Sequence, residues 1–256
     1  MPSELSDLRA LVVVPTYNEV ETLPTVVERA LAADERLELL VVDDASPDGT
    51  GALADRLAAC HARSHVLHRK AKQGLGGAYR AGFAWGLARG YGAFCEMDAD
   101  LSHDPADLPR LLRALKGADV VLGSRYVHSG RVENWPTRRR LLSQAGNRYV
   151  HALTAMPIAD ATSGFRAYRR DVLLDLDLAS VTSEGYAFQL ELALRAWRAG
   201  WRIVEVPITF VERSAGASKI SRGIMLEAVW RVALWATQGP RRPAGVNRRS
   251  VGSPPH

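Results

Sequence analysis

The feature that most constrains the fold of this chain is the alternation of short apolar runs with helix-like segments over its first half. The runs have the length of strands and are mostly apolar, and they cover residues 11–15, 37–42, 66–67, 93–97 and 120–122. Helix-like segments separate them, at residues 23–31, 53–60, 75–88 and 108–115. Continuous apolar strands that alternate with helices are typical of a parallel sheet covered on both faces. The sequence therefore predicts an α/β fold with a mostly parallel central sheet and flanking helices.

Polar residues follow four of these apolar runs directly. The four clusters are residues 16–19, 43–44, 98–100 and 124–125. Ligands of open parallel sheets bind beyond the C-terminal ends of the strands. We therefore expect the four clusters to converge on one crevice.

The segment Asp98-Ala99-Asp100 is the central candidate site. Two carboxylates one residue apart at a strand end can hold a hard divalent cation such as Mg²⁺ or Mn²⁺, which prefers oxygen ligands. Such an ion stabilises the negative charge that develops on a phosphate leaving group. Loop aspartates that cap the helix after Pro105 would give the same pattern. The other acidic strand end nearby favours the metal site.

Two further strand ends carry candidate nucleotide contacts. Asp44 is the preferred contact, because its carboxylate can accept hydrogen bonds from a nucleobase or a ribose hydroxyl, whereas Asp43 can hold the turn at residues 46–49. Tyr17 can stack on a base and Glu19 can accept hydrogen bonds from it. Asn18 or Glu19 can also cap the following helix.

Two classes of function are disfavoured. Residues 74–77, Gly-Leu-Gly-Gly, lack the spacing and the strand-first context of the dinucleotide-binding fingerprint, which argues against a nicotinamide oxidoreductase. We expect these glycines to allow close helix packing. Four of the five net positive charges come from the arginines of residues 239–256, so the remaining body is nearly neutral. A nearly neutral body argues against binding of nucleic acid.

The sequence predicts neither a secretory signal nor a membrane-spanning segment. Residues 1–9 have no apolar core, and the best helical candidate, residues 224–236, is shorter than the roughly 20 residues that span a bilayer. Cys60 and Cys95 are too few for a disulfide framework, and we expect both to be buried thiols in a reducing compartment.

The second half of the chain contains fewer strands. Its expected elements are a helix at residues 141–153, a helix at 188–197, an edge strand at 203–211 that contains Pro207, and a helix at 224–236. The last helix, with Trp230 and Trp235, can pack on the core or dock on a membrane interface. Residues 214–221 can form a lid or a loose connection. The basic tail can be disordered or can touch anionic lipid.

Taken in order, nine segments of this chain resemble one family. They are VVVPTYNE, VVDDASPDGT, GLGGAYRAGF, MDADLSHDP, GSRY, NWPTRRRLLS, SGFRAYRR, EGYAFQLEL and VPITFVERSAGASK. The family is the dolichol-phosphate (polyprenol-phosphate) mannose synthases, which are inverting family 2 glycosyltransferases. The resemblance covers residues 10–238. It implies one GT-A domain over residues 1–238, with a donor-binding half at about 10–125, an acceptor-binding half at about 126–238, and the tail beyond.

The resemblance also implies roles for individual residues. The residues implied to bind the guanosine of GDP-mannose are Pro15, Tyr17, Glu19, Val42 and Asp44. The metal and the donor diphosphate would contact Asp98, Ala99 and Asp100, with Mg²⁺ or Mn²⁺ on the two carboxylates. The donor phosphates would contact Arg125, Arg213 and Lys219. Asp98, Asp100 and Arg125 would form the catalytic set.

The implied acceptor is a polyprenyl phosphate at the cytoplasmic face of a membrane, held by Arg139 and Ser143. The protein would associate peripherally, with or without an anchoring membrane protein. Gln189 and Glu191 match a helix that flanks the sugar pocket. Two positions depart from the family pattern. Gln144 stands where relatives often have arginine, so Arg138 or Arg140 would have to supply that charge. Ser102 stands where some relatives have a third metal ligand.

The chemistry of a phosphate acceptor agrees with this composition. A phosphate monoester is largely dianionic at pH 7, so it can attack the anomeric carbon without a protein base. His103 is the only histidine close to the expected crevice, and we interpret it as structural. The arginines at 138–140 can instead be the solvated start of a helix.

Three alternative functions stay open from the sequence. They are the same chemistry with UDP-glucose or another donor, a family 2 transferase with a soluble acceptor, and a non-enzymatic binder of nucleotide sugars. The intact acidic and basic positions, Asp98, Asp100, Arg125 and Lys219, argue against the binder.

Overall fold

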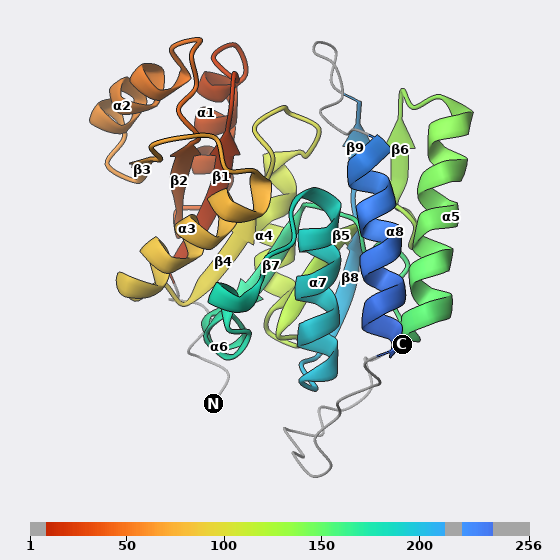
Figure 1. Ribbon diagram of the computed structural model, residues 1–256. Helices are drawn as coiled ribbons and strands as arrows, with labels where there is room; N and C mark the ends of the chain where they lie inside the picture. The colour runs from red at the N-terminus through yellow and green to blue at the C-terminus, as the bar shows by residue number, and fades with distance from the viewer. Residues whose placement is uncertain (1–8, 213–221, 238–256) are drawn as a thin grey trace.

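A seven-stranded sheet forms the centre of the protein (Figure 1). The structure is a computed structural model that describes residues 9–212 and 222–237. In spatial order the strands are β3 (Ser64–His68), β2 (Leu37–Asp43), β1 (Ala10–Thr16), β4 (Ala93–Glu96), β7 (Arg166–Arg169), β5 (Val120–Ser124) and β8 (Ile203–Pro207). Only β7 runs antiparallel to its neighbours. The prediction of a mostly parallel central sheet is confirmed.

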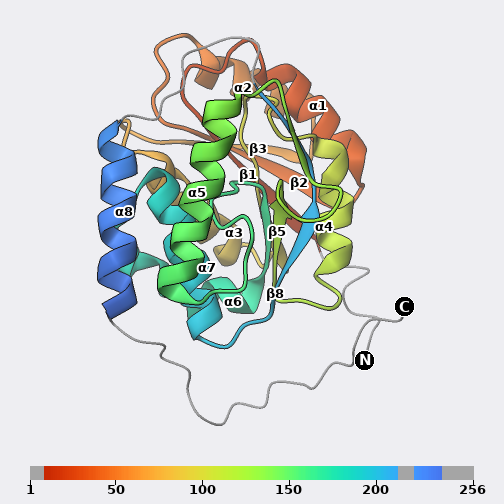
Figure 2. The same ribbon diagram turned by 90° about the vertical axis from the view of Figure 1, so that its right-hand side faces the viewer.

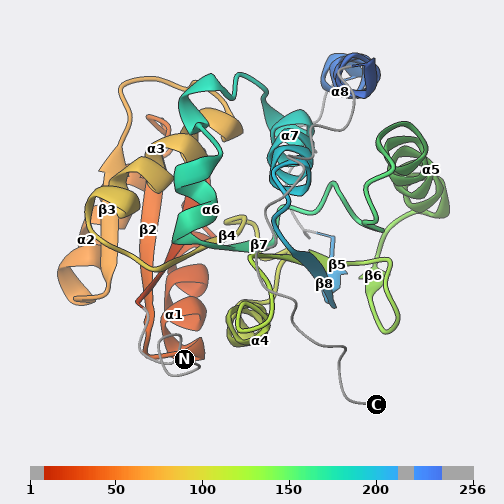
Figure 3. The ribbon, with the colours of Figure 1, turned by 90° about the horizontal axis from the view of Figure 1, so that it is seen from below.

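Helices cover both faces of this sheet, as the view from below shows (Figure 3). One face carries α1 (Leu23–Ala33), α2 (Thr50–Cys60) and α4 (Leu108–Ala114), and the other carries α3 (Leu75–Ala88), α6 (Arg170–Asp175) and α7 (Gly185–Arg198). Beyond α7 lie α5 (Thr137–Thr154) and α8 (Arg222–Thr237), side by side (Figure 2). A separate two-stranded sheet pairs β6 (Arg131–Glu133) with β9 (Thr209–Val211). Short 3₁₀ turns lie at Pro105–Asp107 and Leu178–Ser180.

The packing of α1 follows directly from its sequence. Its buried side chains are the predicted stripe, namely Leu23, Val26, Val27, Ala30 and Leu31. Each large apolar side chain buried in this way contributes about 1.5–3 kcal/mol. The periodicity of the sequence was therefore sufficient to place this helix and its inward face.

Glycines let α3 approach the sheet and α7 closely. A Cβ atom at Gly82 would lie 2.4 Å from the Val13 side chain, and one at Gly76 would lie 2.6 Å from the carbonyl oxygen of Ser183. Neither distance is possible for a real side chain. The expectation that residues 74–77 permit close helix packing is confirmed at Gly76.

Two expectations about local structure were wrong, and one strand was missed. Cys60 is exposed, because it is the last residue of α2, whose buried face consists of Thr50, Gly51 and Ala54. The expected single strand at 203–211 is two strands, β8 and β9, because the chain leaves the main sheet after Pro207 and pairs with β6. The short strand β7 was not predicted.

The last helix, α8, has one face buried against the core and another face exposed. Val232 and Trp235 are buried in the core, whereas Val229, Trp230 and Leu234 are exposed. Within the residues that the structure describes, no helix combines the length and the hydropathy needed to cross a membrane.

Candidate active site

A cavity of about 500 Å³ opens where β1, β2 and β4 end. Eight of the residues predicted from the sequence line it, namely Pro15, Tyr17, Glu19, Asp44, Asp98, Ala99, Asp100 and Arg139. The opposite wall comes from the second half of the chain. It includes residues that were not assigned to the site from sequence, among them Tyr186, Phe210 and Glu212. The cavity therefore joins the two halves of the chain at the carboxyl edge of the sheet.

The backbone turns sharply at each of these three strand ends. Asn18, Ala45 and Leu101 adopt left-handed conformations, with φ of 59°, 57° and 61°. This conformation costs a residue with a side chain roughly 1–2 kcal/mol. Such strain persists only where the surrounding structure fixes it, and it is concentrated at functional sites. Here it lies in the loops that carry Tyr17, Asp44 and Asp100 to the cavity.

At one end of the cavity lie the candidate nucleoside contacts. The Lys72 ammonium lies 3.8 Å from the centroid of the Tyr17 ring. The Asp44 carboxylate forms an ion pair with Arg69 and accepts a hydrogen bond from the Gln73 backbone amide at 3.2 Å. A carboxylate has about four acceptor positions, so these contacts orient Asp44 and leave capacity for a ligand.

Asp43 holds the turn that follows β2, which is the structural role that the sequence also allowed for it. Its carboxylate accepts hydrogen bonds from the hydroxyls of Thr16 (3.2 Å) and Ser46 (2.5 Å), and from the Ser46 backbone amide (3.1 Å). These contacts tie the ends of β1 and β2 to the turn between β2 and α2. Asp43 is therefore not available as the main ligand contact.

The two carboxylates of the Asp98-Ala99-Asp100 segment reach the cavity from the end of β4. The Asp98 side chain is 34% exposed. Asp100 is buried, and its Oδ1 atom accepts a hydrogen bond from the Ser102 backbone amide at 3.0 Å. The described residues contain no group of three or more His, Cys, Asp and Glu side chains that could hold a metal. Two carboxylates still suit Mg²⁺ or Mn²⁺, because Mg²⁺ usually keeps waters and takes phosphate oxygens as its other ligands.

His103 is a structural residue, as interpreted from the sequence. It is buried, and its ring stacks on Phe165 with the centroids 5.0 Å apart. Burial lowers the pKa of His103 to about 4. The imidazole is therefore neutral at pH 7 and is enclosed by aromatic side chains.

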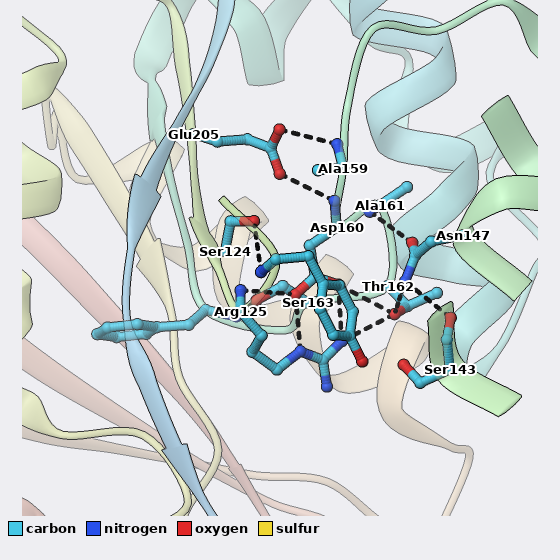
Figure 4. Close-up of polar contacts among 12 residues, drawn as sticks. Ser124, Arg125, Ser143, Asn147, Ala159, Asp160, Ala161, Thr162, Ser163 and Glu205 are labelled. Carbon is cyan, nitrogen blue, oxygen red and sulfur yellow. Dashed lines mark hydrogen bonds and ion pairs between the residues drawn. The ribbon is translucent and has the colours of Figure 1, made fainter. Parts of the chain in front are cut away.

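Arg125 is held in a buried ion pair with Asp160 (Figure 4). The Asp160 carboxylate accepts from Arg125 Nε and Nη2, both at 2.7 Å, and from the Arg125 backbone amide at 3.0 Å. Burial would raise the pKa of Asp160, but the charge and hydrogen bonds of Arg125 outweigh it and hold this pKa below its ordinary value. Arg125 is not among the described residues that line the cavity.

The ion pair belongs to a network that fixes the loop after α5 (Figure 4). The Glu205 carboxylate accepts from the backbone amides of Ala159 (2.8 Å) and Asp160 (2.9 Å). Asn147 Oδ1 accepts from the Ala161 amide at 2.9 Å. The loop continues into Thr162, which accepts a hydrogen bond from Arg125 and lines the cavity. The polar residues after β1, β2 and β4 therefore converge on the cavity, as expected. Arg125, after β5, is not among the described residues that line it but holds Thr162, which is.

Of the two predicted acceptor residues, only Arg139 is among the described residues that line the cavity. Arg139, in the first turn of α5, lines the cavity and forms an ion pair with Glu212. Its guanidinium also lies 4.3 Å from the centroid of the Trp135 ring. Ser143 is half-buried on the next turn and is not among the described lining residues.

Three of the predicted donor contacts are not placed in the cavity. Val42 is fully buried within β2 and is absent from the described lining. Arg213 and Lys219, and the candidate lid at 214–221, lie outside the described residues, as does the tail at 239–256. Their contact with a donor stays a prediction.

The chain matches one family model and several curated proteins. The model described as glycosyl transferase family 2 matches residues 11–176. An undecaprenyl-phosphate mannosyltransferase from Micrococcus luteus is 54% identical over 228 residues, covering 89% of this chain and 94% of the relative. A polyprenol monophosphomannose synthase from Mycolicibacterium smegmatis is 54% identical over 233 residues, covering 90% and 88%.

Solved structures share the fold at much lower identity. Glucosyl-3-phosphoglycerate synthase from Mycobacterium tuberculosis, solved with Mn²⁺, UDP and glucosyl-3-phosphoglycerate, is 20% identical, with a TM-score of 0.64 over 93% of this chain and 82% of that one. A mannosyltransferase from Pyrobaculum calidifontis, solved with GDP-Man and Mn²⁺, is 19% identical, with a TM-score of 0.59 over 94% and 67%. The family model covers well over half of the chain and the curated relatives nearly all of it. The chain therefore belongs to glycosyltransferase family 2 and has its GT-A fold.

Proposed function

We propose that this protein transfers mannose from GDP-mannose to a polyprenyl phosphate with inversion, giving polyprenyl-phosphate mannose and GDP. The observation that carries the proposal is the 54% identity, over about nine-tenths of the chain, to two proteins named for this kind of reaction. The cavity supports it independently, since acidic strand ends face an arginine across one space. Because the body of the protein is nearly neutral, we do not expect it to bind nucleic acid.

The donor would lie along the carboxyl edge of the sheet. Tyr17 and Asp44 would hold the guanosine, as side chains that can stack on and accept hydrogen bonds from it. Asp98 and Asp100 would hold Mg²⁺ or Mn²⁺ together with the diphosphate. The ion would stabilise the charge that develops on the leaving GDP. Arg125 would act indirectly, by holding the wall that Thr162 forms.

The acceptor phosphate would bind at Arg139. The Arg139 guanidinium already pairs with the Glu212 carboxylate at the cavity wall, and a phosphate is a stronger partner for the same planar donor. A dianionic phosphate needs no protein base, which agrees with the neutral, enclosed His103. Its direct attack on the anomeric carbon, opposite the leaving diphosphate, would invert that centre.

Arg139→Ala is expected to raise the KM for polyprenyl phosphate about 10- to 100-fold, because a charge-assisted hydrogen bond is lost. Binding of GDP should stay within twofold of the wild-type affinity. Steady-state kinetics with varied acceptor and titration with GDP measure the two effects. Arg148→Ala, an exposed arginine on the same helix, is the matched control. Equal loss of GDP affinity in Arg139→Ala would contradict an acceptor role.

We also propose that the surface formed by α5 and α8 contacts the membrane that carries the lipid acceptor. Its exposed apolar side chains are Leu141, Leu142, Val229, Trp230 and Leu234. The Tyr149 hydroxyl donates to the Val229 carbonyl at 3.1 Å, so the two helices form one surface. Leu141 lies two residues after Arg139, which places the surface beside the proposed acceptor site. The protein would thus bind peripherally to the cytoplasmic face, directly or with an anchoring protein.

Trp230→Ser combined with Leu142→Ser is expected to reduce co-sedimentation with anionic vesicles several-fold, because about 25 cal/mol per Å² of buried apolar surface is lost. Turnover of a short, water-soluble isoprenyl phosphate should be unchanged. Leu174→Ser, which alters an equally exposed leucine on α6, is the control. Unchanged vesicle binding in the double variant would reject this surface.

The direct test of function is a lipid-extraction assay. The protein is incubated with Mn²⁺, labelled GDP-mannose and polyprenyl phosphate, and the mixture is extracted with organic solvent. Label in the organic phase is expected, and GDP should inhibit more strongly than UDP. No label would contradict the proposal. Stronger inhibition by UDP would favour a UDP-glucose donor, and transfer without lipid phosphate would favour a soluble acceptor.

A further inference from the structure

The proposed acceptor arginine is already paired with a carboxylate of the protein itself. Arg139 and Glu212 both line the cavity, and their side chains form an ion pair. The Arg139 side chain is 33% exposed and the Glu212 side chain is 28% exposed. Because water screens a partly enclosed pair less than one on an open surface, the attraction between the two charges is substantial. A phosphate that binds to Arg139 therefore meets a negative charge that is already in place.

Aromatic packing holds the guanidinium of Arg139 in this position. Arg139 lies in the first turn of α5, and its guanidinium lies 4.3 Å from the centroid of the Trp135 ring. The Trp135 ring in turn packs edge-to-face against Phe210 of β9, with the ring centroids 5.4 Å apart and an interplanar angle of 70°. Arg139 therefore cannot easily turn away from Glu212, which lies two residues after Phe210 in the chain.

Main-chain hydrogen bonds hold Glu212 on the other side of the pair. Its backbone amide donates to the carbonyl of Glu133, the last residue of β6, at 3.2 Å. The backbone amide of Val211 donates to the Ser102 carbonyl at 3.1 Å, and Ser102 lies two residues after Asp100. The backbone at Glu212 is thus tied both to β6 and to the loop that carries the predicted metal ligands. The carboxylate and the guanidinium are presented to each other by separate, well-packed parts of the cavity wall.

We propose that Glu212 is a specificity-determining residue that competes with the acceptor phosphate for Arg139. This inference rests on the proposed function, in which Arg139 binds that phosphate. An entering dianion must either displace the carboxylate from the guanidinium or bind beside it against charge repulsion, and both lower the affinity of the dianion. Removal of the negative charge at Glu212 should therefore strengthen the binding of phosphate.

The competition acts on every anion that reaches Arg139. When only a fraction of the protein molecules can accept an anion, the apparent affinity for each anion falls by that fraction. Soluble anions that bind weakly, such as inorganic phosphate, then stay unbound. The lipid phosphate still binds, because its isoprenyl chain adds apolar contacts that inorganic phosphate lacks. Glu212 would thus keep Arg139 available for a phosphate that is attached to a lipid.

Glu212→Gln keeps the size of the side chain and removes its charge. It is expected to lower the KM for polyprenyl phosphate about 3- to 10-fold, and to lower the inhibition constant of inorganic phosphate by a similar factor. In the Arg139→Ala background the same substitution should change the KM less than twofold, because the competition needs the guanidinium. Glu133→Gln, which alters an exposed carboxylate on the adjacent strand β6, is the matched control and should leave both constants near wild type.

The outcomes separate this inference from the proposed function. A wild-type protein that transfers no mannose contradicts the proposed function, whatever Glu212 does. With an active wild type, a higher KM in Glu212→Gln would overturn the inference, because the carboxylate would then position Arg139 for the acceptor. An unchanged KM would also overturn it. An equal decrease in KM with and without Arg139 would overturn it too, since the charge would then act on the whole cavity and not through Arg139.

Discussion

Asp100→Ala is expected to abolish mannosyl transfer, with a loss of at least roughly 10³-fold in kcat. The reason is that this carboxylate is one of two at the cavity that suit a divalent ion, and no third acidic ligand lies beside them in the described residues. Its loss leaves the developing charge on the diphosphate without the ion. The lipid-extraction assay measures the effect, and titration with Mn²⁺ in the presence of GDP should show a parallel loss of metal affinity.

The matched control for this variant is Asp55→Asn. Asp55 is an exposed carboxylate on α2 that pairs with His68 and lies away from the cavity. It should transfer mannose at the wild-type rate. Wild-type turnover in Asp100→Ala would show that the ion, if bound, is held by other groups.

Asp160→Asn is expected to destabilise the protein by about 3–5 kcal/mol, because it leaves the buried Arg125 guanidinium without its counter-charge. The effect depends on pH with a defined sign. The pKa of Asp160 is depressed in the folded state, so its stabilisation is present above the unfolded pKa of about 3.9. It is lost as the pH falls through the lower folded value.

Urea unfolding of wild type and variant at pH 7 and at pH 3 measures this difference. The gap in unfolding free energy should be large at pH 7 and smaller at pH 3. The same Asp55→Asn variant is the control, since an exposed ion pair contributes only about 0–1 kcal/mol. A gap below about 1 kcal/mol at pH 7 would contradict the importance of the buried pair.

The sequence predicted the first half of the fold well and the second half less well. Strands and helices up to β5 have strong apolar periodicity, as in α1, and local pattern was sufficient to place them. Strand β7 has the sequence Arg-Ala-Tyr-Arg, which lacks a strand pattern. Arg166 is nevertheless fully buried, because its guanidinium donates to the backbone carbonyls of Ser163 and Ala161 in the preceding loop and of Gln189 on α7. No apolar pattern predicts a strand whose arginine is buried by hydrogen bonds to an irregular loop and a helix.

The residues of the candidate site also fall into a group that the sequence could identify and a group that it could not. Residues that directly follow apolar strands, such as Asp44 and Asp100, could be assigned to the crevice because parallel strands end at one edge. Arg125 also follows a strand, but its environment depends on Asp160, which lies in an irregular loop with no sequence signal. Tyr186 and Gln189 reach the cavity from a helix start, where the only signal was their spacing within a family motif.

The most direct test of the account is a crystal structure with GDP and Mn²⁺, in which anomalous scattering locates the ion. We expect the ion at the carboxylates of Asp98 and Asp100, next to the diphosphate. The guanine should lie at the end of the cavity that Tyr17 and Asp44 line. A bound nucleotide with the ion absent from these two carboxylates would contradict the account.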